Sequence, residues 1–562
     1  MKLNTLLLAM ALLLMAAAAW TQTNPLIQDR PYEPIVMQAG ALYAWRDIPV
    51  NEIFVYAYDR AADTWRMLPF QIDQRVRAED PFKPGEEAAW RHTYFAPEDN
   101  IFDEEDELVF MVRDLGDQAS DDQWITNVDS RVYPRLELTF YDPLAPDHKA
   151  YAYVYRSATI QEPVPAPYDM TYDINVDQVE SKYYGVAIDQ NNGLIKDIFI
   201  KQPWGTAVDF FDTQKIRFSG VLDLSGGNPI PLETAEDILY LYDYRQVTAK
   251  PIVRLIRETR ETIHFGTSVI DDIAFYLTTK FYPFSGRVDG GEKLDTESLK
   301  EAFQTEEDIY VLFKYLRQSW DLDEHAAGMT FYSNMNQNIL IDGHPDQVDR
   351  TVGLPIRQWT LNSGPQGSFF TFTQFKDTVS QQVGLYFCDK NYGAPLDSAE
   401  VARDDTGYDL VSYGDQGLWF KNVKSMRLGF TAYFLPSGLS YQDGEKLAAS
   451  VANPVQYSSR MSYPTAVQER RESVPDDFAL WQNYPNPFNA STRITFTLGR
   501  AGIARLELFG PNGQKVATVL DQHLDAGEHS IPFHAADLPS GLYVCRLTAP
   551  AMSRYIKMLL LR

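Results

Sequence analysis

Short stretches in which apolar or aromatic residues alternate with polar ones recur along most of the chain. This period of two is typical of half-buried β-strands, and residues such as Gly, Pro, Asn and Asp separate the stretches as turns would. Few amphipathic patterns of helical length come between them, which argues against alternating strands and helices. The sequence therefore predicts an all-β protein made of several antiparallel β-sandwiches.

Ten stretches carry the strand pattern most clearly. They are 55–58, 136–141, 150–155, 197–201, 237–244, 252–256, 273–282, 369–375, 383–387 and 425–433. One helix is expected after Thr296, with Leu299, Ala302 and Phe303 on one face. Residues 309–316 fit either period.

Changes in composition predict the domain organisation. Three prolines in 157–168 indicate a boundary after an N-terminal β-sandwich domain at 24–156. Residues 169–455 are read as one large β-rich domain or two smaller ones. The polar, aperiodic residues 456–477 are read as a linker, followed by a C-terminal domain at 478–562.

The first residues have the pattern of a secretory signal peptide. Lys2 precedes an apolar run from Leu6 to Ala16, and small residues follow up to Ala19. The alternative is a membrane anchor, but the apolar run is short of the roughly 20 residues that a spanning helix needs. We therefore expect residues 1–19 to be removed, and no membrane insertion after cleavage.

The charge excludes some partners. The 562 residues include 77 acidic and 50 basic ones, a net charge of −27. A surface this acidic repels nucleic acid and anionic membranes. From residue 478 onward eight Lys and Arg stand against five Asp and Glu, a net +3, so the other residues carry −30. This change of sign supports a separate C-terminal unit.

The C-terminal residues predict a small immunoglobulin-like sandwich. Ile494, Phe496 and Leu498 alternate with polar residues, and turn sequences follow at 511–513 and 539–541. The pattern gives six or seven short strands with regular turns.

This stretch resembles the C-terminal sorting domain of proteins exported by the type IX secretion system of Gram-negative bacteria. The resemblance rests on the opening QNYPNPFN, on GEHSIPF, on LPSGLY and on the ending KMLLLR. The matching residues of the motifs include Tyr484, Pro485, Asn486, Pro487, Phe488, Gly541, Tyr543 and Lys557. Ala490 stands where a proline is common in that family.

The resemblance implies how the protein is delivered. In that family the domain is an address without activity of its own. It is recognised by the outer-membrane secretion machinery and is often removed or attached to surface lipopolysaccharide. The chain is thus expected to pass through the periplasm and to become secreted or displayed on the outer cell surface.

An acidic stretch at 96–122 is a candidate calcium site. Asp99, Asp103, Glu104 and Asp106 crowd one predicted loop, and calcium takes six to eight oxygen ligands in irregular loops. The alternative is a solvated acidic loop without a metal. No other cofactor is indicated.

Two rows of tyrosines are candidate ligand sites. Tyr240, Tyr242 and Tyr244 share one face of a predicted strand, and so do the tyrosines at 151, 153 and 155. Flat aromatic rows can stack on sugar rings, whereas the alternative is an aromatic face covered by a second sheet. We expect at least one row to be buried.

Three functions remain open for the body at 24–455. It is a binding protein for glycans or protein partners, a carbohydrate-active enzyme such as a polysaccharide lyase or glycoside hydrolase, or a structural surface-layer protein. No catalytic motif stands out, and the paired carboxylates of a glycosidase cannot be singled out among 77 acidic residues. The sequence therefore favours a protein that is not an enzyme.

Overall fold

The regular structure of the chain is almost entirely antiparallel β-sheet, which confirms the predicted fold class. The computed structural model describes residues 24–42, 45, 48–79, 90–95, 100–224, 230–234, 239–263, 274–288, 309–353, 357–374, 382–390, 412–423, 430–464, 478–481, 483, 486, 488–489, 491–498, 501–510, 514–525, 527–535, 538–549 and 552–560. No helix among these residues has the length and hydropathy needed to cross a membrane. The helix expected after Thr296 lies outside the described residues.

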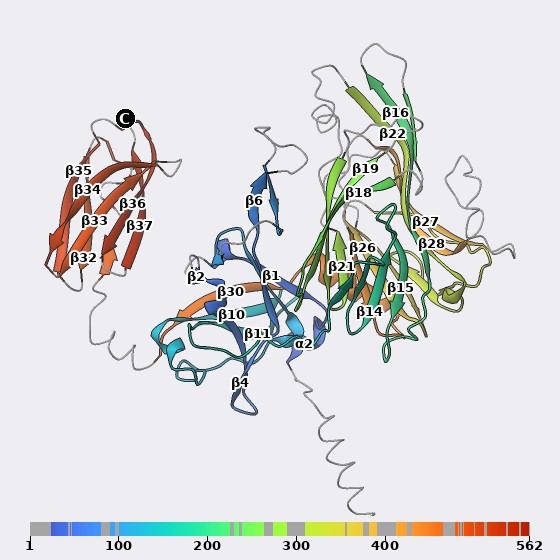
Figure 1. Ribbon diagram of the computed structural model, residues 1–562, viewed down its shortest axis with the longest axis horizontal. Helices are drawn as coiled ribbons and strands as arrows, with labels where there is room; N and C mark the ends of the chain where they lie inside the picture. Colours follow the sequence, from blue (N-terminus) through green and yellow to red (C-terminus); the bar gives the residue numbers. More distant parts are fainter. Residues whose placement is uncertain are drawn as a thin grey trace, which may run out of the picture. The chain divides into compact units, whose positions relative to one another are not determined.

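The chain divides into two compact units (Figure 1). The first holds residues up to 461 without 120–124, and the second holds 462–562 with 120–124. Each unit is described by itself.

Two sheets contain most of the N-terminal strands of the first unit. The three-stranded sheet has the order β1 (Pro34–Gln38), β9 (Glu107–Met111), β5 (Phe70–Asp73). The five-stranded sheet has the order β30 (Gln456–Ser462), β10 (Arg135–Asp142), β11 (Ala145–Arg156), β3 (Ile53–Asp59), β4 (Thr64–Met67). Two short pairs are β2 (Ile48–Pro49) with β8 (Ile101–Phe102), and β6 (Val76–Glu79) with β7 (Trp90–Thr93).

Three further sheets follow in the same unit. The first has the order β12 (Thr171–Asp173), β13 (Gln178–Glu180), β14 (Tyr184–Ile188), β15 (Ile195–Ile200). The second has the order β17 (Ile230–Thr234), β16 (Phe211–Leu224), β22 (Ile309–Leu322), β28 (Ser412–Val423), β27 (Gln382–Lys390). The third has the order β18 (Leu239–Val247), β19 (Leu255–Ile263), β20 (Ala274–Tyr282), β21 (Ser285–Val288), β29 (Phe430–Leu435), β26 (Gly367–Gln374), β25 (Arg357–Gly364), β23 (Thr330–Ser333), β24 (Ile339–Leu340).

Few helices accompany these sheets. Among the described residues the α-helices are α2 (Pro25–Asp29) and α4 (Tyr441–Ala452), and the 3-10 helices are η1 (Ala39–Ala41), η3 (Val50–Glu52), η4 (Val112–Asp114), η5 (Asp129–Val132) and η7 (Glu324–Ala326). Helix α4 begins with a capping box, in which the Ser440 hydroxyl and the Asp443 carboxylate each accept the other's backbone N–H.

One hydrophobic core joins the two β-rich domains that the sequence separates at 157–168. It contains Val109 and Met111 from β9 together with buried residues from β14, β15, β20 and β29. Both predicted domains therefore belong to one compact unit. The predicted linker also begins later than expected, because its first seven residues form β30 beside β10.

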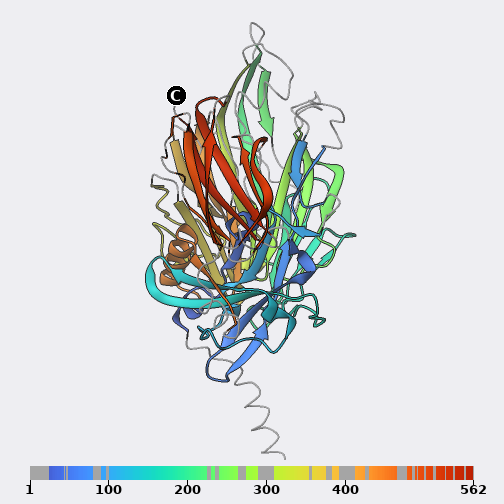
Figure 2. The ribbon, with the colours of Figure 1, turned by 90° about the vertical axis from the view of Figure 1, so that its left-hand side faces the viewer.

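The second unit is a sandwich of two antiparallel sheets. Their orders are β31 (Phe478–Leu480), β32 (Ser491–Leu498), β35 (Gly527–His534) and β34 (Lys515–Leu524), β33 (Gly502–Phe509), β36 (Gly541–Ala549), β37 (Met552–Leu560). Figure 2 shows these strands, in red, running side by side. The predicted alternation holds, since Ile494, Phe496 and Leu498 point into a core shared with β33, β36 and β37.

Candidate functional site

The opening motif of the C-terminal unit is bound to its last strand. The Asn486 side chain donates from Nδ2 to the carbonyl of Lys557 at 3.1 Å and accepts the N–H of Leu559 on Oδ1 at 2.8 Å. The N–H of Phe488 donates to the carbonyl of Leu559 at 2.9 Å. Because β37 is the edge strand of its sheet, these bonds satisfy backbone groups that an edge leaves open.

Buried side chains explain two further parts of the motif. Phe488 is 2 % exposed and lies in the core of the sandwich. Tyr543 is also buried, and its hydroxyl donates to the carbonyl of Pro539 at 2.8 Å, which fixes the turn before β36. A Cβ on Gly541 would meet only the Tyr543 ring at 3.9 Å, so crowding does not require that glycine. Tyr484, Pro485 and Pro487 lie outside the described residues.

We expect Asn486→Ala to loosen the C-terminal strand. Losing two hydrogen bonds of about 1 kcal/mol each should speed exchange of the β37 amides by roughly 5- to 30-fold. This rate is measured by hydrogen exchange of the full chain, followed in a peptide that covers residues 552–560. Arg493→Ala, which removes only a bond of the exposed Arg493 to Ser530, is the control and should leave the exchange unchanged. Equal exchange in the two variants would contradict this role of Asn486.

In the first unit, Arg254 forms the centre of a buried polar network between two sheets. Its Nε donates to Asp73 at 2.7 Å, and its Nη2 donates to Glu107 at 2.6 Å. Gln71 accepts the N–H groups of 252–254 on its Oε1 and donates to the Arg254 carbonyl at 2.8 Å. The network thus fastens β5 and β9 to the start of β19.

In this network the carboxylate of Glu107 is ionised and the phenol of Tyr94 is neutral. Burial would raise the pKa of Glu107, but the charges of Arg254 and Lys280 outweigh it, and the pKa lies below its usual value. Burial raises the pKa of Tyr94, which stays protonated at neutral pH and donates to Glu107 at 3.1 Å. An ionised carboxylate, a paired arginine and a neutral phenol therefore hold one another in place.

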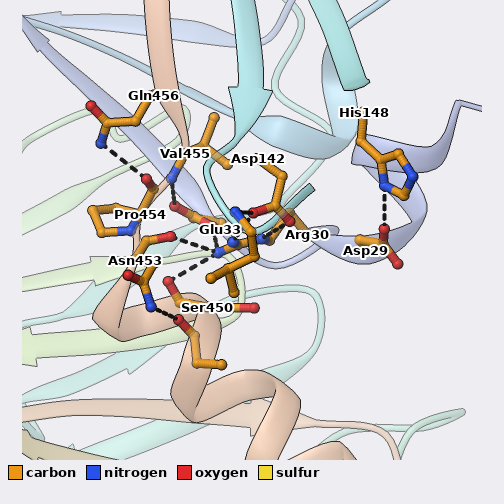
Figure 3. Close-up of polar contacts among 12 residues, drawn as sticks. Asp29, Arg30, Glu33, Asp142, His148, Ser450, Asn453, Pro454, Val455 and Gln456 are labelled. Atoms are coloured by element: carbon orange, nitrogen blue, oxygen red, sulfur yellow. Dashed lines mark hydrogen bonds and ion pairs between the residues drawn. The ribbon is translucent and has the colours of Figure 1, made fainter. Parts of the chain in front are cut away.

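A second buried cluster, here called the Arg30 clasp, consists of Arg30, Glu33, Asp142, Ser450, Asn453 and Val455 (Figure 3). The Arg30 guanidinium makes a two-point ion pair with Asp142, with Nε 2.8 Å from Oδ2 and Nη2 bonded to Oδ1. Its Nη1 donates to the carbonyls of Ser450 at 2.9 Å and Asn453 at 3.1 Å. The arginine therefore caps the carbonyl end of α4.

Glu33 and Asp29 make further polar contacts around the Arg30 clasp. Glu33 accepts the N–H of Val455 at 2.7 Å and pairs with Arg30 at 3.2 Å. Burial raises the pKa of Glu33 to about 7, against the opposing effect of these two partners. Asp29 accepts from Lys446 of α4 and contacts Nδ1 of His148 in β11, each at 2.8 Å. Residues 29–33 are thus bound both to the N-terminal strands and to the last helix of the unit.

One of the predicted calcium ligands, Asp106, accepts hydrogen bonds from the backbone. Asp106 is 1 % exposed, and its carboxylate accepts the N–H groups of Arg75 at 2.9 Å and Asp103 at 3.0 Å. Glu104 is exposed, and Asp99 lies outside the described residues. In the described part of the chain no three His, Cys, Asp or Glu side chains gather as a metal site. The calcium site stays a prediction.

Only one tyrosine row can be placed. Tyr153 and Tyr155 are fully buried and Trp65 packs edge-on against both, at 4.9 and 5.7 Å between ring centroids. Two of the three tyrosines of this row therefore belong to the packing, whereas Tyr151 is partly exposed. The backbone of 240–244 lies in β18, but the side chains of Tyr240, Tyr242 and Tyr244 lie outside the described residues.

Sequence reasoning missed both buried networks. Arg254 lies about 180 residues from Asp73, and Arg30 lies about 420 from Ser450, as their bonds record. The spacing of neighbouring residues in the sequence carries no information about partners this far apart. The one available signal was Arg254 within the apolar stretch PIVRLI, where a buried charge requires a partner.

Comparison with known proteins assigns the second unit only. Residues 482–560 match the family model described as the secretion system C-terminal sorting domain. No curated protein matches the chain. The matched residues carry the Asn486 bonds, the Tyr543 turn and the core of the sandwich. Residues 482–560 of this chain therefore form a secretion system C-terminal sorting domain.

Proposed function

We propose that the chain is an exported protein of a Gram-negative bacterium. A type IX-like machinery delivers it through the periplasm to the outer surface or the medium, and its body binds a glycan or a protein partner there. The family match of residues 482–560 carries the delivery part. The signal-peptide pattern of residues 1–19 and the opposite charges of body and sorting domain support it.

A binding role for the body fits its buried polar groups. The Arg254 network and the Arg30 clasp pair their charges internally, as groups that hold a scaffold together do. A rigid β-scaffold that presents loops is a common basis for ligand recognition.

Removing residues 478–562 should stop delivery and leave the body folded. We expect the truncated protein inside native cells, protected from added protease, while the full chain is accessible on whole cells or found in the medium. Cooperative thermal unfolding of the truncated protein serves as the folding control. Normal delivery of a folded, truncated protein would contradict the proposal.

A further inference from the structure

Four aromatic residues from distant parts of the first unit meet near its surface. Tyr32 precedes β1, Tyr183 precedes β14, Trp204 lies between β15 and β16, and Phe284 lies between β20 and β21. Phe284 is fully buried, and the other three are partly exposed. We call these four residues the aromatic shelf.

Two of the three aromatic neighbours of Trp204 lie on the same side of its indole ring. Tyr183 stacks on Trp204 at 4.2 Å and 27°, and Phe284 lies 5.4 Å from Trp204 at 25°. Tyr183 and Phe284 are only 4.9 Å apart, far less than the sum of their distances to Trp204, so they cannot cover opposite faces of the indole. Tyr32 meets Trp204 edge-on, at 5.7 Å and 80°. Among the described residues no ring stacks on the other indole face.

The loop that carries Trp204 is fixed in place. The backbone N–H of Trp204 donates to the carbonyl of Lys201 at 3.0 Å, and the backbone carbonyl of Trp204 accepts the N–H of Ser437 at 2.8 Å. Gly205 packs so closely that a Cβ there would lie 2.1 Å from the carbonyl oxygen of Gln366. A ring held this way loses little freedom when a ligand stacks on it.

Polar side chains accompany the shelf. Lys182 and Gln202 are exposed next to its tyrosine and near its tryptophan in the sequence. The guanidinium of Arg113 lies 4.9 Å from the Phe284 ring centroid. Aromatic surface with a few polar groups beside it is typical of small-ligand sites.

We propose that the aromatic shelf is a carbohydrate-binding site, in which a sugar ring of a neutral glycan stacks through its C–H face on Trp204. A neutral glycan is favoured because the body carries −30, which repels polyanionic polysaccharides. A protein partner would need about 800 Å² of surface on each side, much more than one indole face provides. This inference rests on the proposed binding function of the body, and it names the class of ligand and the place where that ligand binds.

The test uses the full chain in affinity electrophoresis through gels that contain a neutral β-glucan, α-glucan, mannan or xylan. We expect at least one of them to retard the protein, and Trp204→Ala to weaken that retardation at least about tenfold, as loss of a stacking ring would. Trp204→Phe should retain a measurable part. Tyr133→Ala, which removes another partly exposed ring with a cation 4.5 Å away, is the matched control and should behave as the unaltered protein.

The outcomes separate this inference from the proposed function. Retardation that persists in Trp204→Ala, or none with any of the four glycans, overturns the shelf as a neutral-glycan site. Delivery to the surface in the truncation experiment tests the proposed export independently. If Trp204→Ala fails to fold, Tyr183→Ala, which removes the stacked partner, replaces it with the same expected loss.

Discussion

Replacing Arg254 by methionine is expected to lower the free energy of unfolding of the body by about 3–5 kcal/mol. The substitution leaves Asp73 and Glu107 buried without their cation, although the methionine fills most of the space. The Nη1 of Arg254 has no hydrogen-bond partner among the described residues, so nothing is lost at that atom. Chemical denaturation of the truncated body, followed by tryptophan fluorescence, measures the change.

A surface arginine gives the matched control. Arg156 pairs with Glu52 at 2.8 Å, and both side chains are partly exposed, so Arg156→Met should cost less than about 1 kcal/mol. The triple variant Arg254→Met, Asp73→Asn, Glu107→Gln should regain part of the loss, because the uncompensated charges are gone. If the two single variants have the same cost, the Arg254 network does not contribute as its geometry suggests.

The second large effect is expected for Arg30→Met, at about 3–5 kcal/mol near pH 8. This variant removes the two-point pair with Asp142 and uncaps the carbonyls of Ser450 and Asn453. The matched control is Lys446→Met on the same side of the clasp, since the exposed Lys446 pairs only with Asp29 and should cost less than about 1 kcal/mol.

The cost of Arg30→Met should depend on pH through Glu33. Because burial raises the pKa of Glu33 from 4.5 to about 7, its contribution to stability is present below 4.5 and is lost as the pH rises through about 7. Without Arg30, an ionised Glu33 has lost its cation, whereas a neutral Glu33 needs none. Denaturation at pH 5.5 should thus show a smaller loss than at pH 8. A loss that is equal at both pH values would show that Glu33 does not titrate between them.

The strands that could be predicted are those with one apolar face. In β32 the residues Ile494, Phe496 and Leu498 alternate with polar ones, and the structure buries them. β30 gave no such signal, because as an edge strand it exposes most of its side chains and reads as a linker. Residues 309–316 fit both periods, and pairing with β16 and β28 makes them part of a strand.

The candidate sites show where prediction from sequence stopped. The motif around Asn486 was visible because its residues are close in the sequence and form a known pattern. The aromatic shelf draws on residues 32, 183, 204 and 284, each of which is an ordinary strand or loop aromatic in its own segment. Only the packing of the sheets brings them together.

The Arg30 clasp has a consequence for the order in which contacts form as the exported chain emerges from its N-terminus onward. Arg30 can meet Asp142 once about a hundred further residues have emerged, but the carbonyls of Ser450 and Asn453 come more than four hundred residues after it. Until then the segment at 29–33 lacks its partners in and after helix α4, and such long-range contacts form late. Residue 455 completes the clasp 23 positions before β31, and β30 follows it at once beside β10, so the body obtains its last contacts just before the sorting domain begins.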